Sequence, residues 1–194
     1  LKGPLLAQLL YGSPGLRPSD DLDLLVRPQD FSRGRTLLLD LGFEPVDPAD
    51  DYHQTFQRGN TWVELHFSVA PPSSPAMDLH ALWDRAQMFQ FRGQRARSFA
   101  KPDLLIYLTI HAVKHEFARL IWLLDFANAL ADLDERGINQ ALIMSQGLGI
   151  EGALLTICEL ARLSFCSKLP TSIVEAIARN PFITVQAAAI WTNI

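Results

Sequence analysis

Three aspartates stand close together early in the chain, in the stretch LRPSDDLDLLV at residues 16–26. If residues 21–26 form a strand, Asp21 and Asp23 share one face of it, while Leu22 and Leu24 face the core. Two neighbouring carboxylates repel each other and are costly to bury without a partner. A divalent cation removes that cost, and Mg²⁺ prefers carboxylate oxygens while keeping positions for water and substrate phosphate. The spacing therefore indicates a metal site suited to phosphate chemistry.

A third carboxylate occurs in the stretch TWVELHF at residues 61–67, where Glu64 stands between two apolar residues. An acid in this position must face water or a polar neighbour, and an adjacent strand with Asp21 and Asp23 would supply the neighbour. His66 shares the face of Glu64 in such a strand. It either orients Glu64 or contacts substrate, or it makes an ordinary structural hydrogen bond. Asp20 precedes the strand and either caps it or is solvated.

The elements that must position these acids follow from hydrophobic spacing and from glycine and proline. We expect a helix over 4–10, a loop over 11–20, a strand over 21–26, a helix over 29–43 and a hairpin over 53–69 that turns at Gly59-Asn60. A short helical or irregular segment over 79–89 and a basic turn with a short strand over 91–99 complete this half. One long helix over 103–133 follows, then helices over 138–147, 151–166, 172–179 and 182–193. The predicted fold class is α+β: a small mixed sheet with flanking helices in residues 1–100, then an all-α domain in residues 101–194.

Composition limits the function classes. The chain has 194 residues, of which 48% are apolar and 20% charged, so it can bury a substantial core. Its net charge is −4 and it lacks a basic block, which argues against binding to long nucleic acid. No apolar run reaches the ~18–20 residues that span a bilayer, and we expect no membrane partner and a cytoplasmic location. The chain starts at Leu1 in what reads as the end of a strand, so it resembles a piece of a longer protein.

Two cysteines, Cys158 and Cys166, lie in one predicted helix, where eight residues separate their Cα atoms by ~12 Å. That distance is too long for a disulfide. We expect both to be small buried apolar residues in a reducing compartment.

The acids begin the apolar run at 24–26 instead of following it, which argues against sugar-nucleotide glycosyltransferases and aspartyl-phosphate phosphatases. The order of motifs instead resembles the polymerase-β-type nucleotidyltransferase superfamily, in which D-h-[DE]-h is followed by h-[DE]-h, where h is apolar. More narrowly, LKG at 1–3, LYGSPGLRPSDDLDLLVRPQD at 10–30, WVELHF at 62–67 and LTIHAVKHEFARLIWLLDFA at 108–127 resemble a bacterial group of uncharacterised nucleotidyltransferases. The resemblance covers roughly residues 1–130.

The superfamily also has a Gly-[GS] turn, whose backbone N–H groups hold a nucleoside triphosphate at a helix N-terminus. Lys2-Gly3 ahead of the first helix fits that geometry, although Pro4 replaces the usual Gly or Ser and removes one donor. Gly12-Ser13 matches the letters better but lies too close to Asp21. We favour Lys2-Gly3.

The resemblance implies a two-metal mechanism with Mg²⁺ or Mn²⁺, in which an NMP group passes from an NTP to an acceptor hydroxyl. Asp21 and Asp23 would bind both metals, and Glu64 would bind the catalytic metal and help to activate the acceptor. The partners would be the NTP and an acceptor that is a small molecule, a peptide or a protein. The implied nucleotide-binding residues are Lys2, Gly3, Arg17, Ser19, Lys114 and Arg119, and His66 and His115 are further residues of the cleft.

Several of these residues have ordinary alternatives. Arg17 holds the β- or γ-phosphate, is a solvated loop residue, or is a partner for Asp20. Lys114, His115 and Arg119 form the far wall of the cleft in one reading. In the other, His111 and Asp125 of the same stretch are buried polar anchors between helices. His111 and His115 are four residues apart, but Lys114 stands where a zinc protease motif has Glu, so zinc is disfavoured.

A second class of function is a non-catalytic regulatory or antitoxin-like module that binds a partner on the same fold. The proline after Gly3 favours this alternative, and the intact set of acids counts against it. A third is a helical interaction protein with an incidental acidic strand, which predicts that Glu64 lies far from Asp21 and Asp23.

Overall fold

The computed structural model describes residues 1–193. The chain divides into two compact units, Leu1–Phe99 and a second unit from Ala100 onward. Each is described by itself below.

The first unit contains a four-stranded sheet in the order β1-β4-β3-β2. β1 runs parallel to β4, whereas β4 with β3 and β3 with β2 are antiparallel, so the predicted mixed sheet is confirmed. The hairpin of β3 and β4 turns at Gly59-Asn60, as expected. The elements in chain order are α1 (Pro4–Tyr11), η1 (Pro14–Leu16), β1 (Asp21–Leu25), η2 (Pro28–Asp30), α2 (Phe31–Asp40), β2 (Glu44–Pro45), β3 (His53–Arg58), β4 (Thr61–His66), α3 (Leu79–Arg85), β5 (Gln87–Phe91) and β6 (Gln94–Ser98).

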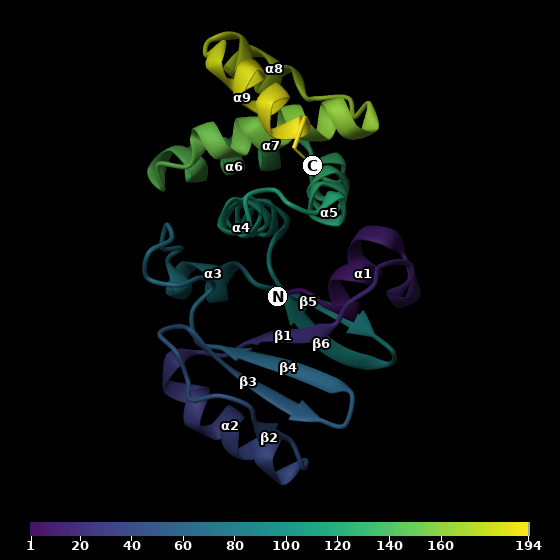
Figure 1. Ribbon diagram of the computed structural model, residues 1–194, viewed down its shortest axis with the longest axis vertical. Coiled ribbons are helices and arrows are strands. Elements are labelled where there is room, and N and C mark those ends of the chain that lie inside the picture. Colours follow the sequence, from purple (N-terminus) through teal and green to yellow (C-terminus); the bar gives the residue numbers. More distant parts are fainter. Residues whose placement is uncertain (194) are drawn as a thin grey trace. The chain divides into compact units, whose positions relative to one another are not determined.

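One face of this sheet is covered by α2, which lies along it in Figure 1. The core between them is made by Leu38, Phe43, Phe56, Val63 and Leu65. Strand alternation places Val63 and Leu65 in this core, so Glu64 and His66 must point to the other face. Leu22 packs against the same core as predicted, whereas Leu24 is 41% exposed because β1 is an edge strand. The expectation that Leu24 is a core residue was therefore wrong.

A second, two-stranded sheet occupies the segment for which a basic turn with a short strand was expected. β5 and β6 form a hairpin in which Phe91 pairs with Gln94. Both turn residues have positive φ, 49° at Arg92 and 77° at Gly93. Such a turn matches the twist of the two strands. Arginine seldom occupies its first position, so the sequence does not mark this hairpin turn.

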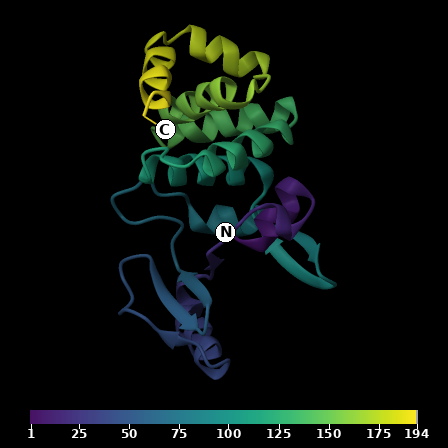
Figure 2. The same ribbon diagram turned by 45° about the vertical axis from the view of Figure 1, so that its right-hand side comes forward.

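The second unit is entirely helical, and Figure 2 shows its helices stacked in successive layers. At its centre lies α7, whose Leu154, Ile157 and Leu160 are fully buried. Within residues 100–193 the helices are α4 (Lys101–Lys114), α5 (Leu120–Ala131), α6 (Glu135–Gly147), α7 (Glu151–Phe165), α8 (Thr171–Ala178) and α9 (Phe182–Trp191).

The single long helix expected over 103–133 is wrong, because the chain breaks between α4 and α5. Glu116 and Phe117 both have positive φ, and the Phe117 N–H donates to the Ala112 carbonyl at 2.8 Å. This six-residue closure is the Schellman ending of a helix, which usually uses glycine. Here no glycine marks it, and burial of the Phe117 ring accompanies the turn.

The two cysteines are both free thiols, but they differ in exposure. Cys158 is fully buried in α7, as predicted. Cys166 is exposed, because it lies just beyond the end of α7 in a left-handed conformation. The expectation that both are buried was wrong for Cys166.

Candidate active site

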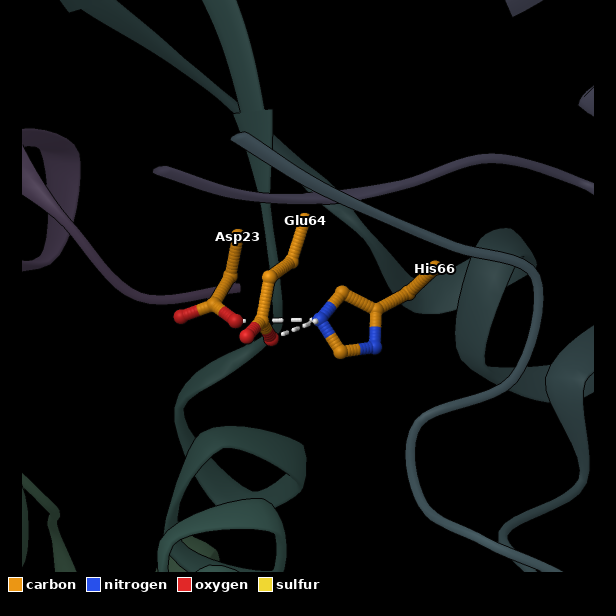
Figure 3. A group of neighbouring side chains, drawn as sticks. All are labelled: Asp23, Glu64 and His66. Atoms are coloured by element: carbon orange, nitrogen blue, oxygen red, sulfur yellow. Dashed lines mark hydrogen bonds and ion pairs between the residues drawn. The ribbon is translucent and has the colours of Figure 1, made fainter. Parts of the chain in front are cut away.

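The acidic residues come together through the parallel pairing of β1 with β4. In this register Asp23 lies opposite Glu64, and Leu25 lies opposite His66. Paired residues of adjacent strands share a face of the sheet, so Glu64 and Asp23 point the same way, as Figure 3 shows. Asp23 is 2% exposed and His66 is buried, whereas the side chain of Glu64 is 29% exposed. The third class of function, a helical interaction protein with an incidental acidic strand, predicted that Glu64 lies far from Asp23. It is therefore excluded.

His66 joins the two carboxylates. Its Nε2 atom lies 3.0 Å from Asp23 Oδ1 and 3.1 Å from Glu64 Oε2. Its other ring nitrogen, Nδ1, is buried and has no hydrogen-bond partner among residues 1–193. All polar contacts of this imidazole in the described residues are therefore directed at the acids.

A second cation approaches Asp23 from the N-terminal segment. Lys2 Nζ lies 3.4 Å from Asp23 Oδ2, which has no hydrogen-bond partner among the described residues. Lys2 was predicted to contact the nucleotide, and the structure places its ammonium group beside the acid cluster.

A layer of side chains supports the imidazole. The ring of His53, which pairs with His66 across β3 and β4, is stacked on it with centroids 5.0 Å apart and planes 18° from parallel. Asp50 Oδ2 lies 2.8 Å from His53 Nδ1, and the Asp50 carboxylate also accepts the backbone N–H groups of Tyr52 and His53. Sequence reasoning missed His53 and Asp50. Counting outward from the Gly59-Asn60 turn pairs residue 53 with residue 66, so the hairpin itself contained the signal for His53.

The charges of the cluster shift the proton affinities of its members. Burial raises the pKa of Asp23, but the hydrogen bond from His66 and the charge of Lys2 outweigh it and hold the pKa well below its ordinary value. Burial lowers the pKa of His66, but hydrogen bonds to Asp23 and Glu64 reverse this and raise it. Asp21 has a raised pKa, first because it is partly buried and second because the Asp23 and Glu64 charges repel it. Asp21 is thus electrostatically coupled to the pair, as its place on the same strand face requires.

Among the described residues, Asp23, Glu64 and His66 form a group whose donor atoms lie within 4.8 Å of one another. Two carboxylates and an imidazole suit a divalent cation. The predicted set was Asp21, Asp23 and Glu64. The compact group contains two of these acids, and its third member is His66 in place of Asp21.

The two candidate glycine turns have different surroundings. Gly3 caps α1 with φ 93° and ψ −158°, and a Cβ built on it would lie 3.2 Å from Leu22 Cδ2. Gly12 ends α1 in the left-handed conformation, and the Ser13 hydroxyl accepts the N–H of Gly15. Of these two turns, Lys2-Gly3 is the one that lies against β1.

Two loop residues complete the first unit's predicted site. Arg17 is buried, and its Nη1 donates to the Pro18 carbonyl at 3.2 Å, so the alternative of a solvated loop arginine is excluded. The Ser19 hydroxyl donates to the backbone carbonyl of Asp21 at 2.6 Å. It therefore ties the loop to the start of β1.

The remaining predicted residues belong to the helical unit. His115 and the Trp122 ring have centroids 4.8 Å apart, and the Arg119 guanidinium lies 5.4 Å from the centroid of that ring. His111 and His115 also lie together, with ring centroids 4.6 Å apart. Lys114 is the last residue of α4. The structure gathers His115 and Arg119 around one tryptophan, and their contact with a nucleotide stays a prediction.

Comparison with solved structures gives the class of the fold. The chain is similar to the solution structure of the antibiotic-resistance factor ANT(2'')-Ia, with a TM-score of 0.55 and 14% sequence identity over 77% of this chain and 83% of that one. The architecture is a nucleotidyltransferase fold. Residues 1–165 match the sequence model described as uncharacterised nucleotidyltransferase, so the chain belongs to that family. No curated protein matches the sequence. Within residues 1–193, none of the helices combines the length and the apolar character that crossing a membrane requires.

Proposed function

We propose that this protein catalyses metal-dependent transfer of an NMP group from an NTP to an acceptor hydroxyl. The observation that carries the proposal is the pairing of Asp23 with Glu64 on one face of the sheet, in a chain of a nucleotidyltransferase family. The cation is Mg²⁺ or Mn²⁺, held by Asp23 and Glu64 with Asp21 beside them. When bound, it stabilises the charge that develops on the attacking and leaving oxygens.

The residues of this chain divide the remaining work. The backbone at Gly3 and the side chains of Lys2, Arg17 and Ser19 bind the triphosphate. The acceptor oxygen forms a bond to the α-phosphorus, the bond from that phosphorus to the bridging oxygen breaks, and pyrophosphate leaves. The acceptor proton passes to the carboxylate of Glu64, which is the more exposed of the two paired acids.

Lys2 has two roles in this proposal. Without a metal its ammonium group offsets the charge of Asp23 at 3.4 Å. When a cation and a triphosphate enter, the flexible lysine side chain turns from the carboxylate to the phosphates, which are the stronger cluster of negative charge.

The first test is binding. We expect each accepted NTP to raise the thermal midpoint of the protein only when Mg²⁺ or Mn²⁺ is present, because a ligand that binds the folded state stabilises it by mass action. Asp23→Asn should remove this metal-dependent shift. Asp20→Asn is the matched control, since Asp20 is exposed and precedes the strand, and it should keep the shift.

The second test is transfer. α-³²P-labelled NTPs are incubated with the protein and with fractions of a cell extract, and label that becomes attached to an acceptor is measured. Asp23→Asn should abolish labelling while circular dichroism stays unchanged. Labelling that survives in Asp23→Asn contradicts the proposed chemistry, and the absence of any metal-dependent nucleotide binding favours the non-catalytic module.

A further inference from the structure

We propose that His66 is itself a metal ligand, so that Asp23, Glu64 and His66 form one mixed oxygen and nitrogen site that prefers Mn²⁺ to Mg²⁺. The inference concerns the metal of the proposed reaction and rests on that proposal. It differs from the all-carboxylate set that the sequence predicts, because it adds an imidazole nitrogen and thereby changes which ion the site selects.

The distances between donor atoms fit an octahedral ion. In octahedral coordination with bonds of ~2.1 Å, neighbouring ligand atoms lie about 3.0 Å apart. The separations from His66 Nε2 are 3.0 Å to Asp23 Oδ1 and 3.1 Å to Glu64 Oε2, and no pair in the group exceeds 4.8 Å. A tetrahedral zinc site with similar bonds requires about 3.3 Å or more between neighbours. The His66 nitrogen is thus spaced from each of the two carboxylate oxygens as adjacent corners of an octahedron are.

The imidazole is held in the orientation that a ligand needs. Figure 3 shows its Nε2 directed at the facing carboxylates of Asp23 and Glu64. His66 is buried and stacked on His53, whose Nδ1 lies 2.8 Å from Asp50 Oδ2. The ring has no polar contact through Nδ1 among residues 1–193. Its packing therefore restricts the ring to an arrangement in which Nε2 meets the acids.

The donor types then decide between ions. Mg²⁺ is bound by oxygen and keeps several waters. Imidazole nitrogen favours first-row transition metals, and Mn²⁺ also accepts carboxylates in octahedral geometry. A site of two carboxylates and one imidazole consequently discriminates against Mg²⁺ at the position of His66.

The experiment measures binding of the metal alone. Isothermal titration with MnCl₂ and MgCl₂ is applied to the wild type, to His66→Gln and to His80→Gln. Glutamine places an amide near the position of Nε2, so it replaces the nitrogen ligand by an oxygen. His80 is the matched control, because its side chain is 81% exposed on α3 and contacts only Asp84 among the described acids.

We expect His66→Gln to weaken Mn²⁺ binding by at least about 10-fold, since even outer-shell partners of metal ligands contribute that much. Mg²⁺ affinity should change far less, so the preference for Mn²⁺ shrinks. The alternative is that His66 is a protonated clamp that only hydrogen-bonds the acids. In that case its removal leaves Mn²⁺ binding unchanged or strengthens it, and either result overturns the proposal.

A second measurement does not depend on whether His66→Gln folds. Electron spin echo envelope modulation of Mn²⁺ bound to the wild type should show the coupling of a directly bound imidazole nitrogen, and His80→Gln should keep it. Absence of nitrogen coupling in the wild type overturns the proposal. Failure of the proposed function looks different, because Mn²⁺ would then show its nitrogen ligand in a protein that binds no NTP and transfers no label.

Discussion

The turn at Gly3 should be the most sensitive glycine of the first unit, and the effect of Gly3→Ala can be estimated from the structure. Gly3 has φ 93° and ψ −158°, a combination that is essentially restricted to glycine. A Cβ at this position would lie 3.2 Å from Leu22 Cδ2 and 3.5 Å from the Asp21 carbonyl oxygen. The new methyl group would therefore press on β1 at the place where the strand presents its acids.

Gly12 provides a matched control at the other end of the same helix. It also has positive φ, 77°, but it lies in the left-handed helical region and nothing lies within 4 Å of a built Cβ. Left-handed backbone costs a residue with a side chain about 1–2 kcal/mol. The backbone at Gly3 costs up to about 3 kcal/mol, and the contact with Leu22 adds to it. We expect Gly3→Ala to destabilise the first unit by at least about 1 kcal/mol more than Gly12→Ala.

The assay must report on the first unit separately from the helical unit. Hydrogen exchange with mass spectrometry of the peptide that contains β1 does so, and 1.4 kcal/mol corresponds to about a tenfold change in an opening equilibrium. For a unit of this size the thermal midpoint should fall by about 4–8 °C per kcal/mol. Equal effects of the two substitutions, or faster exchange at β1 in Gly12→Ala than in Gly3→Ala, would refute the close approach of Gly3 to the strand.

Two further predictions concern protonation and thiol reactivity. The metal-free protein should be most stable from about pH 4 to about pH 6.5. These limits are the ordinary pKa values of an aspartate and of a histidine side chain. The pKa of His66 is raised by folding, so its contribution is complete below its unfolded value and is lost as the pH rises through the folded one. The pKa of Asp23 is lowered, so its contribution is present above its unfolded value and is lost as the pH falls. Urea unfolding at pH 5.5 and pH 8.5 tests this, and His66→Gln should remove the loss at high pH; a flat profile contradicts it. Iodoacetamide should modify Cys166 and spare Cys158, whose thiol pKa is raised by burial; equal rates by peptide mapping would show that α7 opens readily.

Local patterns were sufficient to predict the strand of Asp21 and Asp23 and the hairpin of Glu64. In both, apolar and polar residues alternate, and Gly59-Asn60 marks the turn. The break at 115–119 could not be predicted, because two residues that rarely adopt positive φ form it without glycine or proline. The turn at Arg92-Gly93 was missed for a related reason, since arginine at the first turn position gives no sequence signal.

The register of the site lies beyond local pattern altogether. β1 and β4 are neighbours in the sheet, although about forty residues separate them in the chain, and nothing within either strand states which residue faces which. A shift of two residues would keep every side chain on its face and would place Asp21 instead of Asp23 opposite Glu64. The predicted metal set therefore contained acids from the right strands but could not identify the pair at its centre.

That pair is the reason why we expect the proposed site to depend on Asp23 more than on Asp21. Asp21 begins β1 opposite Trp62 and is partly exposed, so water relieves its repulsion from the other acids. Asp23 lies in the middle of the strand, is almost fully buried and has Glu64 directly beside it. A buried carboxylate next to another is stable only if positive charge meets it. In the metal-free protein the Lys2 ammonium group supplies that charge, and His66 Nε2 lies 3.0 Å from the same carboxylate. A divalent cation held by Asp23 and Glu64 would meet the same electrostatic requirement in place of Lys2.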